Sequence, residues 1–479
     1  MRPSLEELVK MREKYNFIPI VEEVMADMET PLTIFSHFKQ LDYAFLLESA
    51  KEGRFGRYSY IGITPYNVIK EHFGTVEVIG AEGRTILDGP LLKCLKSIKA
   101  ELKAPSFLDM PDFLGGMVGC LSYDVIRRTG ADAKKYGDMP QSILVISSEL
   151  IIYDHLKHRL FIVVFMIDPI DIELEYERAL SRIGELKKLI GETNNYEKLI
   201  AIPGDKKPIE FSSNMEREEF LEKVNVIKKH IVSGYVEQII LSQRFEVITH
   251  LSPFEIYRRL RYINPSPYMF YLNFPEFQII GSSPESLVKV KDGEVIYRPI
   301  AGTLPKGDTV DEDNTLAQSL LDDEKERAEH LMLVELCKSD MGKVCKRDSI
   351  EITSLMDIEY FSHVIHMVST IQGDIASDKD VFDVMACSLP AGTVSGVPRE
   401  MAMDIIDELE PTPREYYGGA VGYISLSGDM DMAISIRTVL IKGRRAFIQA
   451  GAGIVRDSVP EKEYMETIEK SKAVMKAIC

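Results

Sequence analysis

The sequence contains no tryptophan and only six cysteines among its 479 residues. No two of these cysteines form a CxxC pair, which excludes the common zinc and dithiol motifs. The chain also lacks any run of 18 apolar residues, the length that a membrane-spanning helix needs. Its first 15 residues are charged, whereas a signal peptide has an apolar centre. We therefore expect a protein of the reducing cytoplasm with free thiols.

Positive charge is also scarce, since 57 Lys and Arg face 75 Asp and Glu and the net charge is −18. Such a balance disfavours nucleic acid as a partner, because a polyanion would be repelled. It does not exclude a small dianion, which a few local Lys and Arg side chains can bind. With 45% hydrophobic and 28% charged residues, the chain has the composition of a globular protein of one to three domains.

Two strand-rich regions flank a polar segment. Short apolar runs separated by Gly and Asp-Gly turns predict antiparallel strands up to residue 167, followed by a helix at 170–190. A Gly-, Pro- and Asn-containing stretch predicts a linker at 191–212. We therefore divide the chain into an amino-terminal region, 1–190, and a second region, 213–479, that opens with a helix at 215–232 capped by Ser213 or Asn214.

Successive antiparallel strands with helices between them favour an α+β fold over a doubly wound parallel sheet. The sequence GGMVGC at 115–120 is repeated as GGAVGY at 418–423. Coincidence is one explanation, and the other is two related, mostly antiparallel sheets packed face to face with helices outside. The runs 418–428, 432–442 and 445–455 predict a three-stranded meander.

Two segments place carboxylates on one face of a helix. Glu326 and Glu329 are three residues apart in the first, and Glu463, Glu466 and Lys470 follow a helical spacing in the second. Each pair alone is more often a solvated helix face. If the two helices converge, the four carboxylates repel one another, and a hard divalent cation such as Mg²⁺ suits their oxygen atoms.

Arg437 lies in an apolar run that predicts a strand. A strand interior rarely contains an Arg unless the guanidinium pairs with an anion, so we expect either a substrate carboxylate or a structural salt bridge. Polar, glycine-containing turns at 281–285, 299–303, 390–396 and 450–454 offer backbone N–H groups that suit carboxylates.

Five ordered motifs then resemble one family, the chorismate-utilising enzymes. They are KExxEH at 325–330, PAGTVSG at 390–396, YGGAVGY at 417–423, AGAGI at 450–454 and ExxExxxK at 463–470. LLES at 46–49, GRYS at 56–59 and FLGGMVGCLSYD at 113–124 extend the resemblance to the amino-terminal region. The family includes anthranilate, aminodeoxychorismate, isochorismate and salicylate synthases, and it implies the two-sheet α+β fold.

Two positions favour the anthranilate synthase branch of the family. Gln238 stands where the isochorismate and salicylate enzymes have a Lys that activates water, and Ala301 stands where aminodeoxychorismate synthases have a Lys nucleophile. The family's Arg-Asn-Asp and Gly-Ala-Pro-Lys are Lys-Ser-Asp at 338–340 and Gly-Val-Pro-Arg at 396–399 here, which puts substrate affinity or helix packing in doubt. The rival interpretations are an aminodeoxychorismate synthase subunit and a non-catalytic tryptophan-binding homologue.

The resemblance implies amination of chorismate by ammonia and loss of pyruvate, the first committed step of tryptophan biosynthesis. It implies Glu285 as general acid, His366 as the group that assists proton removal, and Gln238 beside them. Mg²⁺ would be bound by Glu329 and Glu466, with Glu326 and Glu463 assisting directly or through water. The expected substrate-binding residues are Thr393, Tyr417, Arg437, Gly451, Gly453 and Lys470.

Regulation and a partner are also implied by the resemblance. Tryptophan would inhibit by binding at Glu48, Ser49, Pro267, Tyr268 and Met269. Because no Cys lies in a glutaminase motif, ammonia would come from a separate glutamine amidotransferase subunit, in a hetero-oligomer such as a heterotetramer. We expect no nucleic-acid or membrane partner.

Overall fold

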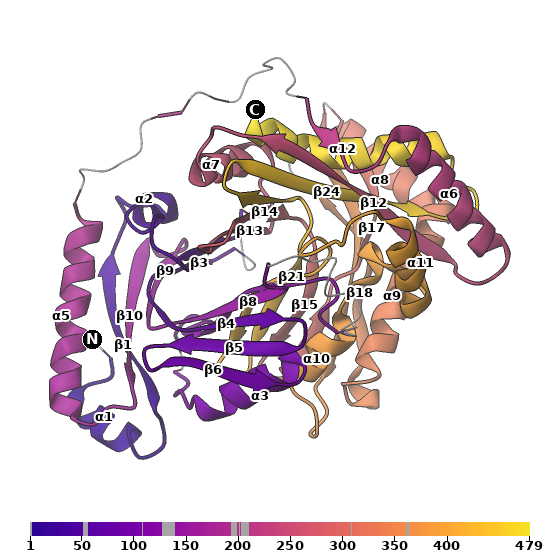
Figure 1. Ribbon diagram of the computed structural model, residues 1–479. Coiled ribbons are helices and arrows are strands. Elements are labelled where there is room, and N and C mark those ends of the chain that lie inside the picture. The colour runs from indigo at the N-terminus through magenta and orange to yellow at the C-terminus, as the bar shows by residue number, and fades with distance from the viewer. Residues whose placement is uncertain are drawn as a thin grey trace.

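Two large antiparallel sheets form the centre of the molecule (Figure 1). The computed structural model describes residues 2–50, 56–107, 109–126, 139–192, 199–200, 202, 210–307, 309–360 and 364–479. In sheet A the spatial order of strands is β1 (Phe17–Met25), β10 (Arg159–Ile167), β9 (Glu149–Asp154), β3 (Tyr58–Gly62), β2 (Phe45–Glu48), β13 (Tyr268–Asn273), β14 (Gln278–Ser283), β23 (Thr438–Lys442), β24 (Arg445–Ile454), β12 (Gln238–Ile248) and β11 (Ser212–Ser213), and β20 (Gly396–Val397) also pairs with β12.

Sheet B is built in the same way. Its spatial order is β17 (Ile300–Pro305), β19 (Val364–Asp374), β16 (Glu294–Tyr297), β15 (Ser286–Lys291), β22 (Met430–Ile434), β21 (Ala420–Ser425), β7 (Gly116–Leu121), β8 (Ser142–Ser147), β4 (Pro65–His72), β5 (Thr75–Gly80) and β6 (Gly83–Asp88), and β18 (Glu351–Tyr360) pairs with β19. Both sheets contain strands from before and after the predicted linker. Most of that linker (193–198, 201 and 203–209) lies outside the described residues, so the domain division stays a prediction.

Helices cover the outer faces of the sheets. Over sheet A lie α1 (Leu5–Met11), α2 (Pro31–Ser36), α5 (Ile172–Ile190), α7 (Pro253–Ile263) and α12 (Pro460–Ile478), with α6 (Arg217–Val232) and α11 (Arg399–Leu409) packed on β12 and β24. Beside sheet B lie α3 (Leu91–Glu101), α8 (Val310–Asp322), α9 (Glu324–Met341) and α10 (Val381–Ser388). The predicted cap of α6 was wrong: the helix begins after Glu216, while the Ser213 hydroxyl donates to Gln243 Oε1 at 2.7 Å.

The largest apolar cluster joins the inner faces of the two sheets. Phe45 and Phe270 of sheet A and Val118 and Val288 of sheet B are among its buried members. Burial of these faces supplies most of the driving force for folding. The α+β prediction with two face-to-face sheets is therefore confirmed.

Two details of the sequence interpretation were wrong. The predicted meander is split, because β21 and β22 belong to sheet B whereas β23 and β24 belong to sheet A. The repeated glycine motifs do not mark two related sheets, since β7 and β21 are neighbours in sheet B with Gly119 opposite Gly422. A period-two pattern identifies strands but does not say which sheet each one joins.

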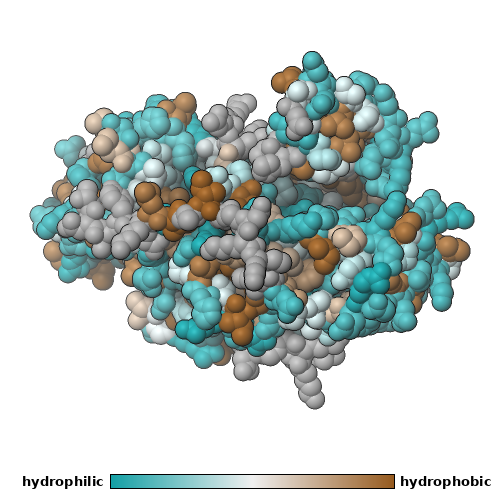
Figure 2. Space-filling model, turned by 90° about the horizontal axis from the view of Figure 1, so that it is seen from above, coloured by the Kyte–Doolittle hydropathy of each residue, from teal (hydrophilic) through white to brown (hydrophobic). Residues whose placement is uncertain are grey.

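Hydrophilic residues dominate the surface seen from above, and apolar residues occur there in separate groups (Figure 2). Among the helices in the described ranges, none is both long and apolar enough to cross a membrane.

Replacing Gly119 by Ala should destabilise the protein. A Cβ at this position would lie 1.9 Å from the Ile143 carbonyl oxygen of the neighbouring strand, so the strands must separate. We expect a loss of about 1–3 kcal/mol in unfolding free energy, seen as a lower Tm in calorimetry. Gly184 is the control, because a Cβ there meets no atom within 4 Å and Ala is the better helix former. A Gly119→Ala variant as stable as the wild type would contradict the packing of β7 against β8.

Candidate active site

The predicted site residues gather where two adjacent strands cross from one sheet to the other. Strand β14 of sheet A continues through Glu285 into β15 of sheet B, and β22 of sheet B continues through Arg437 into β23 of sheet A. Because β14 pairs with β23 and β15 pairs with β22, the two crossings lie side by side. The Ile434 N–H donates to the Glu285 carbonyl at 3.1 Å, and the Ser282 N–H donates to the Arg437 carbonyl at 3.2 Å.

Arg437 occupies the crossing and not the strand interior that its sequence context predicted. Its φ of 50° belongs to the left-handed region, which a strand does not use. Its guanidinium donates through Nη1 to the Lys470 carbonyl. Burial lowers the pKa of Arg437, while the carboxylates of Glu466 and Glu285 oppose that effect. The positive charge of the Arg437 guanidinium therefore lies within the site, where it can pair with an anion.

Glu285 has the electrostatics of an acid that stays protonated near neutrality. Burial raises the pKa of its carboxyl to about 7, although the Thr393 hydroxyl and the charges of Lys470 and Arg437 act to lower it. The Thr393 Oγ1 is itself buried and near enough to the Glu285 carboxyl to lower its pKa, although no described atom lies within 3.5 Å of it in hydrogen-bond geometry. A buried hydroxyl beside an acid and two cations is suited to a polar ligand.

Two glycines keep the floor of the site open. A Cβ at Gly451 would lie 3.0 Å from the Tyr417 hydroxyl, and a Cβ at Gly453 would lie 2.9 Å from Gln238 Nε2. Lys470 Nζ donates to the Gly451 carbonyl at 3.1 Å. The structure thus brings together Gln238, Glu285, Thr393, Tyr417, Arg437, Gly451, Gly453 and Lys470.

His366 lies on β19, and its ring contacts strand β17 in the PIAGT motif, where the sequence predicted a turn. His366 Nδ1 is 2.9 Å from Thr303 Oγ1 and 3.3 Å from the Gly302 carbonyl oxygen. A carbonyl only accepts, so it is satisfied by the tautomer with the proton on Nδ1, and in that tautomer Nε2 is the basic nitrogen. The adjacent Gly302 has φ +74° and lies against Glu326, which links His366 to helix α9.

The two acidic helix faces lie near one another. Burial and the charge of Glu329 raise the pKa of Glu326, and Glu466 of α12 adds to the effect. Burial also raises the pKa of Glu463, with a further contribution from Glu466, while Lys325 of α9 acts to lower it. Charged side chains on each helix therefore shift the pKa of a carboxyl group on the other helix.

The carboxylates are held by lysines. Lys470 Nζ is 2.6 Å from Glu466 Oε1, and Lys325 Nζ is 3.6 Å from Glu329 Oε1. Across the described ranges, no three His, Cys, Asp or Glu side chains are close enough together to bind one metal ion. The four predicted ligands still fit a hard divalent cation chemically, because they supply only oxygen atoms and two of them have raised pKa values that a cation would relieve.

A separate cavity of about 650 Å³ contains all five residues predicted for the inhibitor. Glu48 is buried in its wall, where Tyr257 donates to Oε2 and Arg261 is 3.3 Å away. No described atom forms a hydrogen bond with its buried Oε1. The Tyr268 hydroxyl donates to Asp431 at 2.9 Å on another wall. The sequence analysis missed several charged lining residues, because they come from distant segments: Arg57, Asp112, Lys157, Arg159, Lys289, Lys291 and Asp431.

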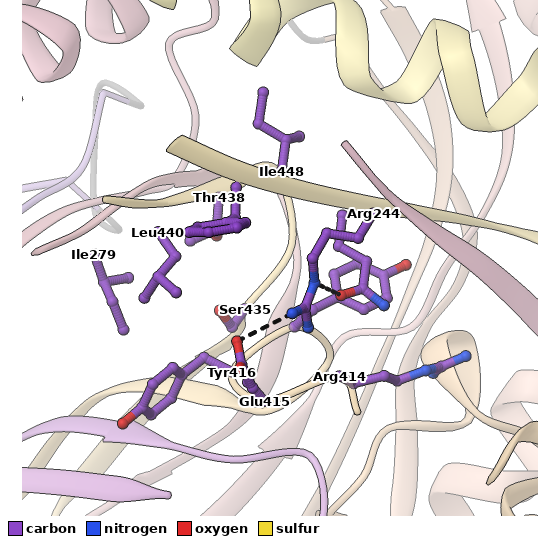
Figure 3. A pocket seen from close by; sticks show the side chains of 12 residues that line it. Arg244, Ile279, Arg414, Glu415, Tyr416, Ser435, Thr438, Leu440 and Ile448 are labelled. Atoms are coloured by element: carbon purple, nitrogen blue, oxygen red, sulfur yellow. Dashed lines mark hydrogen bonds and ion pairs between the residues drawn. The ribbon is translucent and has the colours of Figure 1, made fainter. Parts of the chain in front are cut away.

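A small cavity of about 30 Å³ lies behind Tyr417, between sheet A and the 414–417 turn (Figure 3). Arg244 donates to Gln449 Oε1 at 3.1 Å and is 3.4 Å from Glu415 on one side of it. Ser435 and Arg414 line it as well. The sequence analysis did not identify Arg414, because its carbonyl partners Val394 and Ile240 are distant in sequence.

The comparisons with known proteins agree on one family. Residues 42–476 match the chorismate binding enzyme family. The chain is 42% identical to the anthranilate synthase component 1 of Acetivibrio thermocellus, covering 99% of this chain and 98% of that one. It is 44% identical to the anthranilate synthase component 1 of Aquifex aeolicus, covering 99% and 97%.

Solved structures give the same fold. Anthranilate synthase component I from Streptococcus pneumoniae superposes with a TM-score of 0.75 at 34% identity, covering 89% of this chain and 93% of that one. The menaquinone-specific isochorismate synthase from Escherichia coli superposes with a TM-score of 0.73 at 17% identity, covering 99% of both chains. The second likeness shows the fold alone.

Stability should decrease with pH because of Glu285. Its pKa is raised from an ordinary value of 4.5 to about 7 in the folded protein. The stabilisation is therefore complete below pH 4.5 and is lost as the pH rises through 7. Calorimetric Tm values from pH 5 to 8 should fall less steeply for Glu285→Gln than for the wild type. Parallel curves for the two proteins would show that Glu285 is already ionised at low pH.

Proposed function

Since the chain belongs to the chorismate-binding enzymes, and within them to the anthranilate synthase component 1 group, we propose that it converts chorismate and ammonia to anthranilate and pyruvate. One observation supports this chemistry above the others. A carboxyl with a pKa of about 7 lies between Arg437, Lys470 and Thr393, which is an arrangement for protonating a leaving group on an anionic substrate.

In the first step, the nitrogen of ammonia forms a bond to ring carbon 2 of chorismate. Both ring double bonds shift, the bond from carbon 4 to its hydroxyl breaks, and Glu285 gives its proton to the departing oxygen, so that water leaves. The new ammonium group on carbon 2 then loses a proton to solvent. Gln238 lies against Gly453 and has a neutral amide. Because an amide is not a base, it does not activate a water that would compete with ammonia.

In the second step, the proton on carbon 2 is removed and the bond from carbon 3 to the enolpyruvyl oxygen breaks. The ring becomes aromatic, and the released enolpyruvate takes up a proton to become pyruvate. His366 assists the proton removal through Nε2 in the tautomer whose Nδ1–H faces the Gly302 carbonyl. Arg437, Lys470, Tyr417 and Thr393 bind the carboxylates of the substrate, with the backbone of Gly451 and Gly453 beneath.

Glu326, Glu329, Glu463 and Glu466 would hold Mg²⁺. When bound, the cation would neutralise and orient the ring carboxylate of the substrate. The carboxylates on α9 and α12 would otherwise repel an anionic substrate. Burial, together with the charges of neighbouring carboxylates, already raises the pKa of Glu326 and Glu463.

We also propose a separate amidotransferase subunit as the source of ammonia. The relatives are named component 1, which implies a second component. All six cysteines are free thiols, and burial raises the pKa of Cys94, Cys120, Cys337, Cys345 and Cys387, so these thiols are poor nucleophiles. Free thiols also suit the reducing cytoplasm, where we place the enzyme.

Glu285→Gln should lower kcat for anthranilate formation by about 100-fold to 10,000-fold, because the amide cannot protonate the leaving hydroxyl. Anthranilate fluorescence with chorismate, Mg²⁺ and ammonium salt measures the rate, and pyruvate should appear in equal amount. Glu294→Gln is the control, since among the described residues its carboxylate accepts only from Gln372, at 3.3 Å on sheet B. Release of an aminated but non-aromatic product by the wild type would favour an aminodeoxychorismate synthase, and retained turnover in Glu285→Gln would remove Glu285 as the acid.

Tryptophan should inhibit by binding in the 650 Å³ cavity, where Glu48 would accept from the α-ammonium group and Met269, Pro267 and Tyr268 would contact the indole. Ser49→Phe would occupy part of this space. We expect the inhibition constant for tryptophan to rise at least about 10-fold, equivalent to roughly 1.4 kcal/mol, with kcat within a factor of two of the wild type. Ser97→Ala on α3 should leave inhibition unchanged. Normal inhibition of the Ser49→Phe variant would exclude this cavity.

A further inference from the structure

Arg414 is buried between the candidate active site and helix α11, with 3% of its surface exposed. Its guanidinium makes a paired interaction with Glu410, from Nε to Oε2 at 2.8 Å and from Nη2 to Oε1 at 2.6 Å. Nη2 also donates to the Ile240 carbonyl at 2.6 Å, and Nη1 donates to the Val394 carbonyl. One side chain thus ties together α11, β12 and the PAGTVSG turn.

The same guanidinium lies against two aromatic rings. Its central carbon is 4.6 Å from the centre of the Tyr123 ring and 5.6 Å from the centre of the Tyr417 ring. The backbone of Arg414 also fixes Tyr417, whose N–H donates to the Arg414 carbonyl at 3.0 Å. Tyr417 is therefore held by a turn and by the cation beside its ring.

These contacts converge on two proposed substrate ligands. The Val394 carbonyl follows Thr393, so the bond from Arg414 fixes the segment that presents the Thr393 hydroxyl. The Ile240 carbonyl belongs to β12, and Ile240 lies 2.9 Å from where a Cβ of Gly451 would be, beside the Tyr417 hydroxyl. We propose that Arg414 is a positioning residue, which sets the Tyr417 and Thr393 hydroxyls at the spacing that the substrate's carboxylate requires. This inference rests on the proposed function, because it takes both hydroxyls as substrate ligands.

A structural ion pair alone would not need this geometry. A buried pair of charges often contributes little to stability compared with apolar residues of similar volume. The planar guanidinium, in contrast, binds a carboxylate and two carbonyls in fixed directions, which a Lys ammonium does not reproduce. The arrangement therefore predicts a specific effect on substrate binding that is separate from the effect on stability.

The test compares Arg414→Lys in two backgrounds. In the otherwise wild-type enzyme, we expect the KM for chorismate to rise at least about 10-fold, because small displacements of binding groups weaken a preorganised site strongly. In a Thr393→Val/Tyr417→Phe background, which lacks both hydroxyls, the same substitution should change KM by less than about 3-fold. An equal rise in both backgrounds would show that Arg414 does not act through these hydroxyls.

Two further variants separate positioning from folding. Arg414→Met combined with Glu410→Gln removes both charges and should recover much of the wild-type Tm, yet its KM for chorismate should stay raised. A normal KM in this stable variant would reduce Arg414 to a structural role. Arg445→Lys changes an exposed arginine of β24 that pairs with Glu246, and it should leave KM within about 3-fold of the wild type, as a matched control.

The wild-type assay distinguishes failure of this inference from failure of the proposed function. If the wild type forms no anthranilate from chorismate and ammonia, the proposed function fails and the inference fails with it. If the wild type is active and Arg414→Lys raises KM equally in both backgrounds, only the positioning role is overturned.

Discussion

The site depends on two neighbouring strands that leave one sheet and enter the other at the same level. In each crossing a residue is freed from the strand ladder, Glu285 in one and Arg437 in the other, and hydrogen bonds between the two segments keep them together. Both sheets are large and share one apolar core, so the crossings have little freedom to move. A carboxyl and a guanidinium are thereby fixed side by side at the edge of the core, which is a rigid base for chemistry on an anion.

The acidic groups of the site differ in their electrostatic environment, and this difference gives them different roles. Burial raises the pKa of Glu285 to about 7, so a large share of it is protonated near neutrality, whereas the carboxylates of α9 and α12 lie close enough for Glu466 to raise the pKa of both Glu326 and Glu463. The first arrangement suits proton donation, and the second suits a divalent cation. The strand pair β13 and β14 connects the proposed inhibitor cavity to the two strand crossings. Met269 lies opposite Ser282, and the Ser282 N–H donates to the Arg437 carbonyl.

The sequence predicted the fold class, and it indicated most residues of the site because local motifs carry them. The helical spacing of Glu326 and Glu329 is visible without a structure, and so is the turn around Thr393. The predicted turn at 450–454 was wrong, because Gly451 and Gly453 lie within strand β24. Arg437 was placed in a strand because alternation of apolar residues does not reveal a crossing at positive φ. Arg414 was missed for a related reason: Glu410 is a local partner, but the Val394 and Ile240 carbonyls lie on separate segments that only the tertiary fold brings to it.

A crystal structure of the Glu285→Gln variant with chorismate and Mn²⁺, whose anomalous scattering locates the cation, tests the central claim most directly. The account predicts one metal peak between Glu326/Glu329 and Glu463/Glu466. It also predicts the ring carboxylate of chorismate on that metal, the second carboxylate at Arg437 and Tyr417, and the carbon 4 hydroxyl facing residue 285. A substrate bound away from the strand crossings, or a metal held by other residues, would contradict it.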